Sequence, residues 1–405
     1  MRLLLLASLL AGPAMAQQAL PDPAAVEMAI ASHPAVRAAD ARLNAARAQA
    51  RALAAGSHEF TTAATVSSRQ LASGADLLEY DISLSRAVRL PGKAALDRRA
   101  GEAGIRAADS MAEDARHQAA SSLSDHWWEW LGAAAERRVL EEAVATLEEA
   151  ANAIARRHAV REAATMELEQ AEAAVASARA AERAAAGREA AARAALAANF
   201  PALPLPAAAP LLPPPELPTE GLAMLGTLVV ERSHEIGAAM AEAEMSGHLA
   251  ARARRERVAD PSIGIRGFSE FGGAERGVGL MVSFPLGGRH RRALADQAEA
   301  LADASRARAT MVRHQVEALA GRSVAAAEAG YAAWQEALAA ATKSSSAAAR
   351  ARRGHELGGL DLSDRLYAER VAQESALAER LARAEAWRAI TRLRIDSHTL
   401  WMHTH

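Results

Sequence analysis

The sequence contains no cysteine, which excludes a disulfide framework, a thiol nucleophile and a thiol-linked lipid anchor. Aromatic residues make up only 3% of the 405 residues, and much of the apolar content is alanine, so a large core of bulky side chains is not expected. Beyond the N-terminus no stretch reaches eighteen uncharged apolar residues, and we therefore expect no membrane-spanning helix. The formal net charge of −2 gives no reason to expect a nucleic-acid partner.

The first sixteen residues have the pattern of a secretory signal peptide. Arg2 supplies a positive start, residues 3–10 form an apolar run, and Ala14-Met15-Ala16 is a small-x-small cleavage site before Gln17. The alternative is a buried N-terminal helix. We expect residues 1–16 to be removed and the mature chain to work outside the cytoplasm.

Long tracts without proline are rich in Ala, Glu, Arg and Leu, a composition typical of extended helices packed side by side. In one of these tracts the apolar positions step by four and three residues, namely Leu140, Val144, Leu147, Ala151 and Ile154. This heptad seam predicts coiled-coil packing.

The chain repeats its plan at an offset of 196 residues. The turn at Gly92-Lys93 matches Gly288-Arg289, and "RRHAVREAATMELEQAE" matches "RRGHELGGLDLSDRLYAER". We expect a first repeat over 17–200, a second over 219–397 and a C-terminal tail over 398–405. Between the repeats lies the proline-rich segment 201–218, which is either a stiff extended connector or a disordered linker.

Each repeat predicts the same order of elements. The first should contain a helix, two strands, a long helix and a returning helix, over 22–55, 58–70, 78–90, 93–157 and 164–199. In the second copy the corresponding ranges are 219–258, 261–271, 276–286, 289–352 and 362–397. At 1.5 Å per residue each long helix is a rod of roughly 95 Å.

Two of the predicted strands alternate polar and apolar residues over a length that fits a tilted strand in a membrane barrel. Four phenylalanines and a tyrosine also fall in the predicted strand regions, where barrels carry aromatic rings at the lipid boundary. A small soluble sheet packed on helices is the alternative. The candidate lipid-facing residues are Tyr80, Ile82, Leu84, Val278, Leu280, Val282 and Phe284.

Four strands cannot close a barrel, and an open edge in lipid leaves unpaired backbone groups that cost several kcal/mol each. If the strands enter a membrane, several chains must therefore pool them. Three chains would supply twelve strands.

The chain resembles the TolC-type outer-membrane efflux protein family, the outer membrane factors of tripartite efflux systems. The resemblance covers nearly all of the mature sequence and rests on the exported start, the duplicated halves, and the segments "SLSRAVRLPGK", "MVSFPLGGRHRRA" and "RRGHELGGLDLSDRLYAER". It implies a mainly helical fold with long coiled-coil hairpins that form an α-barrel, plus four strands per chain in a trimeric 12-stranded β-barrel. The protein would be a passive channel-tunnel in the outer membrane, extending into the periplasm.

The resemblance also implies partners and a cargo. A homotrimer would dock to an inner-membrane pump through a periplasmic adaptor, the membrane fusion protein. The "PGK" and "GGR" turns are similar to those of the heavy-metal and cation branch, so the cargo would be metal cations or small toxic compounds.

In this family the helical turns form the periplasmic mouth, where acidic residues constrict the tunnel. The resemblance places Asp364 at such a position, with Glu167 as its counterpart and Tyr367 where some members have a second acid. Arg161 stands where the family usually has glycine, as at Gly358 in the other copy. The alternative is that Asp364 is only a charge favoured by a helix N-terminus.

No catalytic constellation is present. The His-Glu pairs lack the second histidine of a zinc protease, and no Gly-x-Ser-x-Gly motif occurs. We therefore expect a protein that is not an enzyme and has no cofactor. The tail residues His398, Met402, His403 and His405 form either a weak metal site or a disordered end. The alternative to a channel is a periplasmic coiled-coil adaptor.

Overall fold

The structure is a computed structural model that describes residues 19–401. The predicted signal peptide and the tail residues Met402, His403 and His405 lie outside the described residues. The chain divides into two compact units. Unit 1 comprises the chain up to Arg37, Ala115–Ser233 and the chain from Val316 onward; unit 2 comprises Ala38–Asp114 and His234–Gln315.

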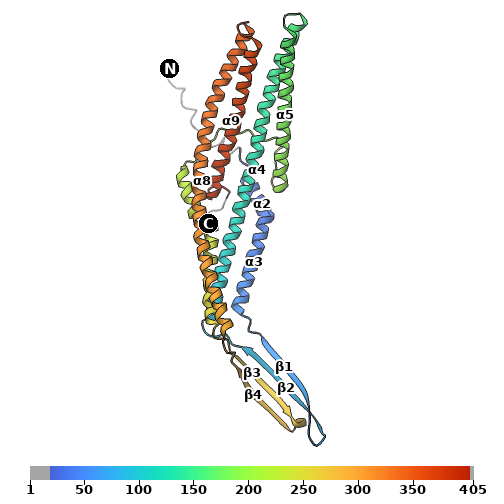
Figure 1. Cartoon of the computed structure of the whole chain (residues 1–405), viewed down its shortest axis with the longest axis vertical. Helices are drawn as coiled ribbons and strands as arrows, with labels where there is room; N and C mark the ends of the chain where they lie inside the picture. Colours follow the sequence, from blue (N-terminus) through green and yellow to red (C-terminus); the bar gives the residue numbers. More distant parts are fainter. Residues whose placement is uncertain (1–18, 402–405) are drawn as a thin grey trace, which may run out of the picture. The chain divides into compact units, whose positions relative to one another are not determined.

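Unit 2 contains a four-stranded antiparallel sheet and the helices that adjoin it. Its strands are β1 (Phe60–Gln70), β2 (Asp76–Ala87), β3 (Ser262–Glu270) and β4 (Glu275–Ser283), in the order β1-β2-β3-β4. The helices are most of α3 (Pro34–Ala55), α7 (His234–Arg255) and the first parts of α4 (Lys93–Ala159) and α8 (Arg289–Glu356). Figure 1 shows that both strand pairs join their helices at the same end of the sheet.

Unit 1 contains two helical hairpins. The later part of α4 turns into α5 (Thr165–Asn199), and the later part of α8 turns into α9 (Leu362–Asp396); the short helices α2 (Pro23–Ser32) and α6 (Leu222–Glu231) complete the unit. Its core contains a cluster of buried tryptophans, in which Trp128 stacks on Trp387 with ring centroids 5.5 Å apart. On the predicted heptad seam Leu140 and Ile154 are buried.

The long hairpins and the four strands confirm the predicted fold class within one chain. Among residues 19–401, no helix has an apolar stretch long enough to cross a membrane.

The first predicted helix of each repeat is wrong, because each is two helices. The segment 22–55 is broken at His33, whose backbone is extended. His33 precedes Pro34, and the α conformation is disfavoured for a residue before proline. The segment 219–258 is broken between α6 and α7, where Arg232 caps α6 at a φ of −102°.

The proline-rich segment 201–218 forms neither helix nor strand, yet it is packed against unit 1. Leu203 and Leu212 are buried, and the backbone carbonyl of Pro213 accepts a 2.9 Å hydrogen bond from Trp387 Nε1. Arg138 and Arg383 donate to other carbonyls of the segment. These contacts hold the segment against the helices of unit 1.

Candidate functional site

The strand register divides the sheet into two faces. Ile82 lies opposite Ala64 on β1 and Gly267 on β3, and Leu280 lies opposite Ile265. Directly paired residues share a face, so the register places six of the seven candidate lipid-facing residues together. These are Tyr80, Ile82, Leu84, Val278, Leu280 and Val282.

This apolar face has no cover within the described chain. Val278 is 85% exposed and Leu280 is 88% exposed, and Ile82 is also exposed. Phe284, the seventh candidate, follows the end of β4 and is exposed as well. Large contiguous apolar surfaces of this kind mark an interaction with another chain or with lipid.

The opposite face is polar. It carries Asp81, Ser83 and Ser85 of β2, and Arg266 of β3 donates a hydrogen bond to Asp81. Phe268 also lies on this face, directly opposite Gly277, where a Cβ atom would come within 2.5 Å of the ring. Phe268 is one of the four phenylalanines in the predicted strand regions, where we expected aromatic rings at the lipid boundary. Its pairing with Asp81 places it on the polar face instead.

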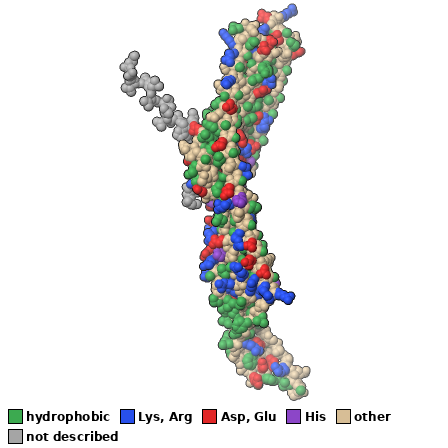
Figure 2. Space-filling model, turned by 60° about the vertical axis from the view of Figure 1, so that its left-hand side comes forward, with side chains coloured by type: hydrophobic (Ala, Val, Ile, Leu, Met, Phe, Trp, Pro, Cys, Tyr) green, Lys and Arg blue, Asp and Glu red, His purple; other side chains and the backbone are tan. Residues whose placement is uncertain are grey.

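Arginines mark both ends of the sheet. Near the helices, the Arg86 guanidinium lies 4.9 Å from the centre of the Phe60 ring. Near the strand turns, Arg69 lies 4.9 Å from the centre of the Phe271 ring. Figure 2 shows hydrophobic side chains gathered over the part of the sheet next to the helices, and charged ones at the turns. The apolar surface therefore has charged limits at both ends.

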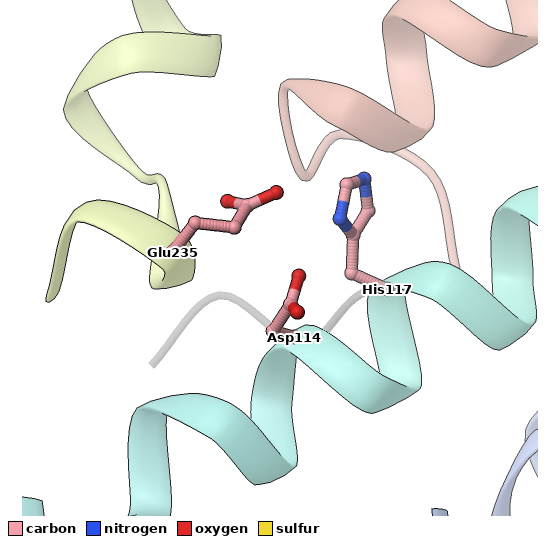
Figure 3. Close-up of side chains that lie close together, drawn as sticks. All are labelled: Asp114, His117 and Glu235. Carbon is pink, nitrogen blue, oxygen red and sulfur yellow. The ribbon is translucent and has the colours of Figure 1, made fainter. Parts of the chain in front are cut away.

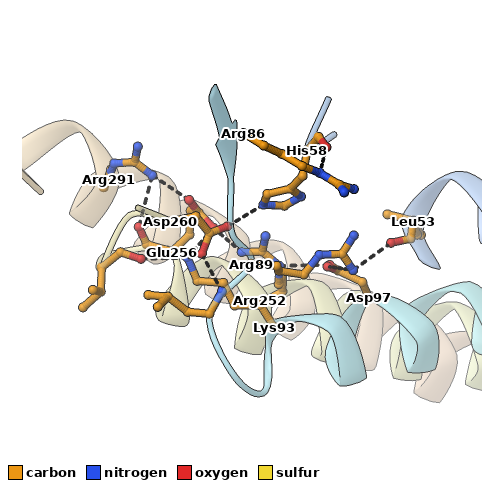
Figure 4. A network of polar contacts seen from close by, with 12 residues as sticks. Leu53, His58, Arg86, Arg89, Lys93, Asp97, Arg252, Glu256, Asp260 and Arg291 are labelled. Carbon is orange, nitrogen blue, oxygen red and sulfur yellow. Dashed lines mark hydrogen bonds and ion pairs between the residues drawn. The ribbon is translucent and has the colours of Figure 1, made fainter. Parts of the chain in front are cut away.

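A polar network ties the sheet to the helices of unit 2 (Figure 4). Its centre is Lys93, the first residue of α4, whose side chain is 1% exposed. The Lys93 Nζ atom lies 2.7 Å from Asp260 Oδ1 and 3.0 Å from Glu256 Oε2, and it donates to the carbonyl of Val258. An ammonium group so deeply buried needs such partners to offset its lost hydration.

Asp260 accepts further hydrogen bonds in this network. The Leu90 N–H donates to Oδ1 over 2.9 Å, and His58 Nε2 lies 3.0 Å from Oδ2. Burial alone would raise the pKa of Asp260, but the hydrogen bonds from Lys93, Leu90 and His58 outweigh it and lower the pKa to about 2. The carboxylate is therefore charged at neutral pH.

A second carboxylate in the same network, that of Asp97, contacts two arginines. Asp97, one turn after Lys93, accepts from Arg252 Nε at 2.9 Å and pairs with Arg89 at 3.2 Å. Sequence reasoning missed the whole network. The sequence offered one signal for a basic residue at this point, the match between Lys93 and Arg289 in the two predicted repeats. Arg289 is exposed, however, so the match did not indicate a buried charge.

The helical turns in unit 1 share one backbone geometry. Arg161 has a φ of 65° and Gly358 a φ of 75°, and both occupy the left-handed region. The Glu162 N–H donates to the Arg157 carbonyl, and the Gly359 N–H donates to the Gly354 carbonyl, which is the pattern of a Schellman motif. Arg161 thus adopts a conformation that favours glycine.

The candidate gate residues lie just after these turns. Glu167 is in the first turn of α5 and Asp364 in the first turn of α9, while Tyr367 is exposed beside Arg370. Asp361 caps α9, because its side chain accepts a 2.8 Å hydrogen bond from the Asp364 N–H. Within residues 19–401, neither Glu167 nor Asp364 forms an ion pair. Their role as a gate stays a prediction.

One charged group near this turn was missed. Glu369 is buried and accepts from Arg365 at 3.0 Å and from Arg352 at 3.4 Å. The spacing of four residues between Arg365 and Glu369 on one helix was the signal that could have found it.

Side chains of metal-binding types occur on α4. Figure 3 shows Asp114 and His117 projecting from this helix one turn apart; it also draws Glu235 of α7. In unit 1 the His117 Nε2 atom already lies 3.0 Å from Asp396 Oδ1, in a buried pair. We therefore assign no ion to His117.

The sequence matches no family model and no curated protein. Solved structures do share its fold. A membrane protein from Pseudomonas aeruginosa superimposes with a TM-score of 0.79 at 20% identity, covering 94% of this chain and 91% of that chain. For the outer membrane protein VceC of Vibrio cholerae the TM-score is 0.75 at 18% identity, covering 92% and 95%.

The open-state MtrE outer membrane channel of Neisseria gonorrhoeae is also similar. Its TM-score is 0.73 at 19% identity, covering 95% of this chain and 90% of that chain. At these identities the similarity establishes the fold.

Proposed function

Since the chain has the TolC-type fold of the outer-membrane channels, we propose that it is the outer-membrane channel-tunnel of a tripartite efflux system. The observation that carries this proposal is the sheet in unit 2. Its apolar face is exposed and its opposite face is polar, as in strands that separate lipid from a water-filled pore.

The proposal requires three copies. Strands β1 and β4 are the edges of the sheet, and each has a partner on one side only among the described residues. Unpaired N–H and C=O groups in hydrocarbon cost several kcal/mol each, so the edges must pair with other chains. Three sheets of four strands give a closed barrel of twelve, within the range of known membrane barrels.

The polar face then lines the pore, and the helical hairpins form the tunnel wall in the periplasm. Transport through such a conduit is passive and is driven by a pump in the inner membrane, reached through a periplasmic adaptor. The acidic residues Asp364 and Glu167, with Tyr367, would narrow the periplasmic mouth. The "PGK" and "GGR" turns favour metal cations as cargo, with small toxic compounds as the second class.

A periplasmic adaptor is the alternative function. It would leave the apolar face of the sheet in water, at a cost of roughly 25 cal/mol for each Å² of apolar surface. An adaptor function would also not explain why the fold is similar to that of outer-membrane channels over most of the chain.

The test is the oligomeric state and conductance of the purified mature chain. We expect a detergent-solubilised trimer by light scattering and defined conductance steps in planar lipid bilayers. A protein that stays monomeric in detergent-free buffer and gives no conductance steps would exclude the channel.

A further inference from the structure

The apolar face of the sheet ends, on the helix side, at a row of paired residues in which Arg86 lies between Phe60 and Ile263. Arg86 Nε donates to the His58 carbonyl over 2.7 Å, and its guanidinium stacks on the Phe60 ring. The two terminal nitrogens of Arg86 bond to no residue in the described part of the chain. A fixed, exposed guanidinium thus stands at the edge of the surface that faces lipid in the proposed channel.

The apolar surface continues a short way onto the helices. A hollow of about 710 Å³ is lined by Phe60 and Leu84 of the sheet together with Ala54 and Ala55 of α3 and Ala94 of α4. Residues three or four positions apart share a helix face. The next residues on these faces are therefore Arg51 and Arg98.

Arg51 and Arg98 are both exposed, and neither forms an ion pair or a hydrogen bond with another residue between positions 19 and 401. The lipid-facing surface thus passes from leucine and isoleucine through alanine to arginine. We call Arg51, Arg86 and Arg98 the arginine collar.

Basic residues greatly outnumber acidic residues in the segments around the collar. The segments 47–60, 84–99, 252–262 and 284–296 together hold fourteen Arg and Lys against five Asp and Glu, although the whole chain has a net charge of −2. Four of the five acids form ion pairs within these segments, namely Asp97 with Arg89, Glu256 with Arg291, Asp260 with Lys93 and Asp296 with Arg257. Figure 2 shows Lys and Arg side chains gathered beside the hydrophobic band.

We propose that the arginine collar binds the phosphates of anionic phospholipids in the membrane leaflet nearest the helices. The inference rests on the proposed channel function, because it needs the apolar face to lie in lipid. Guanidinium groups bind phosphate oxygens in bidentate pairs. Basic residues next to an anionic membrane surface add attraction beyond that of the buried apolar area.

The test measures lipid selectivity by electron paramagnetic resonance of spin-labelled lipids around the full chain in liposomes. Phosphatidylglycerol and phosphatidylcholine labels are compared in the unmodified protein and in the triple variant Arg51→Gln/Arg86→Gln/Arg98→Gln. The control is Arg306→Gln/Arg308→Gln/Arg313→Gln on α8, which removes the same charge. Arg306 lies seventeen residues beyond Arg289, or roughly 25 Å along the helix.

At low salt we expect the unmodified protein and the control to prefer phosphatidylglycerol by about fivefold, the factor that one basic residue near a membrane supplies. The collar variant should lose that preference while still showing motionally restricted lipid. In 1 M salt, where the Debye length is about 3 Å, the preference of the unmodified protein should fall.

Two results would overturn the inference. The first is motionally restricted lipid without any preference for phosphatidylglycerol, or with an equal preference in the collar variant. This result would refute lipid binding by the arginine collar but would remain consistent with the proposed channel. The second is the absence of motionally restricted lipid for both labels. This result would refute both the proposed channel and lipid binding by the arginine collar.

Discussion

The Nζ atom of Lys93 lies 2.7 Å from the Oδ1 atom of Asp260, which is 167 residues further along the chain. Lys93 begins the long helix of the first predicted repeat, and Asp260 lies two residues before the first strand of the second predicted repeat. This ion pair joins segments of the two predicted repeats where the sheet meets the helices. In the proposed channel it lies just outside the lipid.

Breaking this pair should destabilise the protein. Lys93→Met leaves the buried Asp260 carboxylate without its lysine partner, and the expected loss is about 3 kcal/mol. Asp260→Asn should cost less, because Glu256 still lies 3.0 Å from the Lys93 ammonium group. Because the double variant removes both charges, its loss should be smaller than the sum of the two single losses. The measurement is the free energy of unfolding of the detergent-solubilised protein from denaturant titration, followed by circular dichroism at 222 nm.

The control for this pair is Arg289→Met, at the residue that matches Lys93 in the second repeat. Since Arg289 is exposed, its loss should change stability by less than about 0.5 kcal/mol. Additive losses in the double variant would show that Lys93 and Asp260 do not act as a pair.

Asp260 also predicts a dependence of stability on acid. Its pKa is lowered from 3.8 to about 2 in the folded protein, so the folded state holds the carboxylate more strongly than the unfolded chain does. The resulting stability is fully present above pH 4 and is lost as the pH falls toward 2. It amounts to roughly 2–3 kcal/mol for a shift of this size.

The melting temperature of the unmodified protein should therefore fall between pH 4 and pH 2 by more than that of Asp260→Asn, which lacks the titrating group. Parallel melting curves for the two proteins across this range would refute the assignment.

The helical turn at Arg161 predicts a stabilising substitution. A residue with a side chain pays roughly 1–2 kcal/mol to adopt the left-handed region, and glycine does not. Arg161→Gly should therefore stabilise the protein by about 1 kcal/mol, less the entropy that glycine adds to the unfolded chain. The measurement is the free energy of unfolding from denaturant titration.

Gly358 provides the opposite test in the second repeat. A Cβ atom there would meet nothing within 4 Å, so Gly358→Ala changes only the backbone preference. It should destabilise by about 1 kcal/mol. If both substitutions changed the free energy of unfolding in the same direction, the left-handed backbone conformation would not determine the stability of these turns.

Sequence reasoning located the long helices well, because local signals mark their starts. Proline and glycine precede Lys93, two glycines precede Arg289, and the structure begins both helices at those residues. The break at Pro34 also had a local signal, which the predicted single helix overlooked. The break after Arg232 had a weaker signal, because serine, the residue type at position 233, often precedes a helix, but no proline or glycine stands at that point.

The candidate site was predictable only in part. Alternation along β2 and β4 gave the apolar face, since side chains on a strand alternate with a period of two. The pairing of Lys93 with Asp260 depends on contact between segments 167 residues apart, which no local pattern encodes. The side of the sheet occupied by Phe268 depends on register, which pairing with β2 and β4 decides.

The two faces of the sheet should respond differently to a charge. Ile82 is on the apolar face and Ser83, its neighbour, is on the polar face. Ile82→Arg should disfavour insertion by about 2–4 kcal/mol, the cost of an arginine near the middle of a bilayer, and Ser83→Arg should cost much less. Equilibrium folding into liposomes measures both free energies, and equal losses on both faces would contradict a lipid-facing role for Ile82.

Removal of the charge at Asp364 tests the periplasmic mouth. If three copies of this carboxylate converge in the trimer, they bind cations and narrow the opening, so Asp364→Ala should raise single-channel conductance in planar bilayers. Asp361→Asn is the matched control, since asparagine caps a helix about as well as aspartate. It removes a neighbouring charge without disturbing the start of α9. Conductance that is unchanged in Asp364→Ala, or raised equally in both variants, would leave Asp364 as only a helix-terminal charge stabilised by the helix dipole.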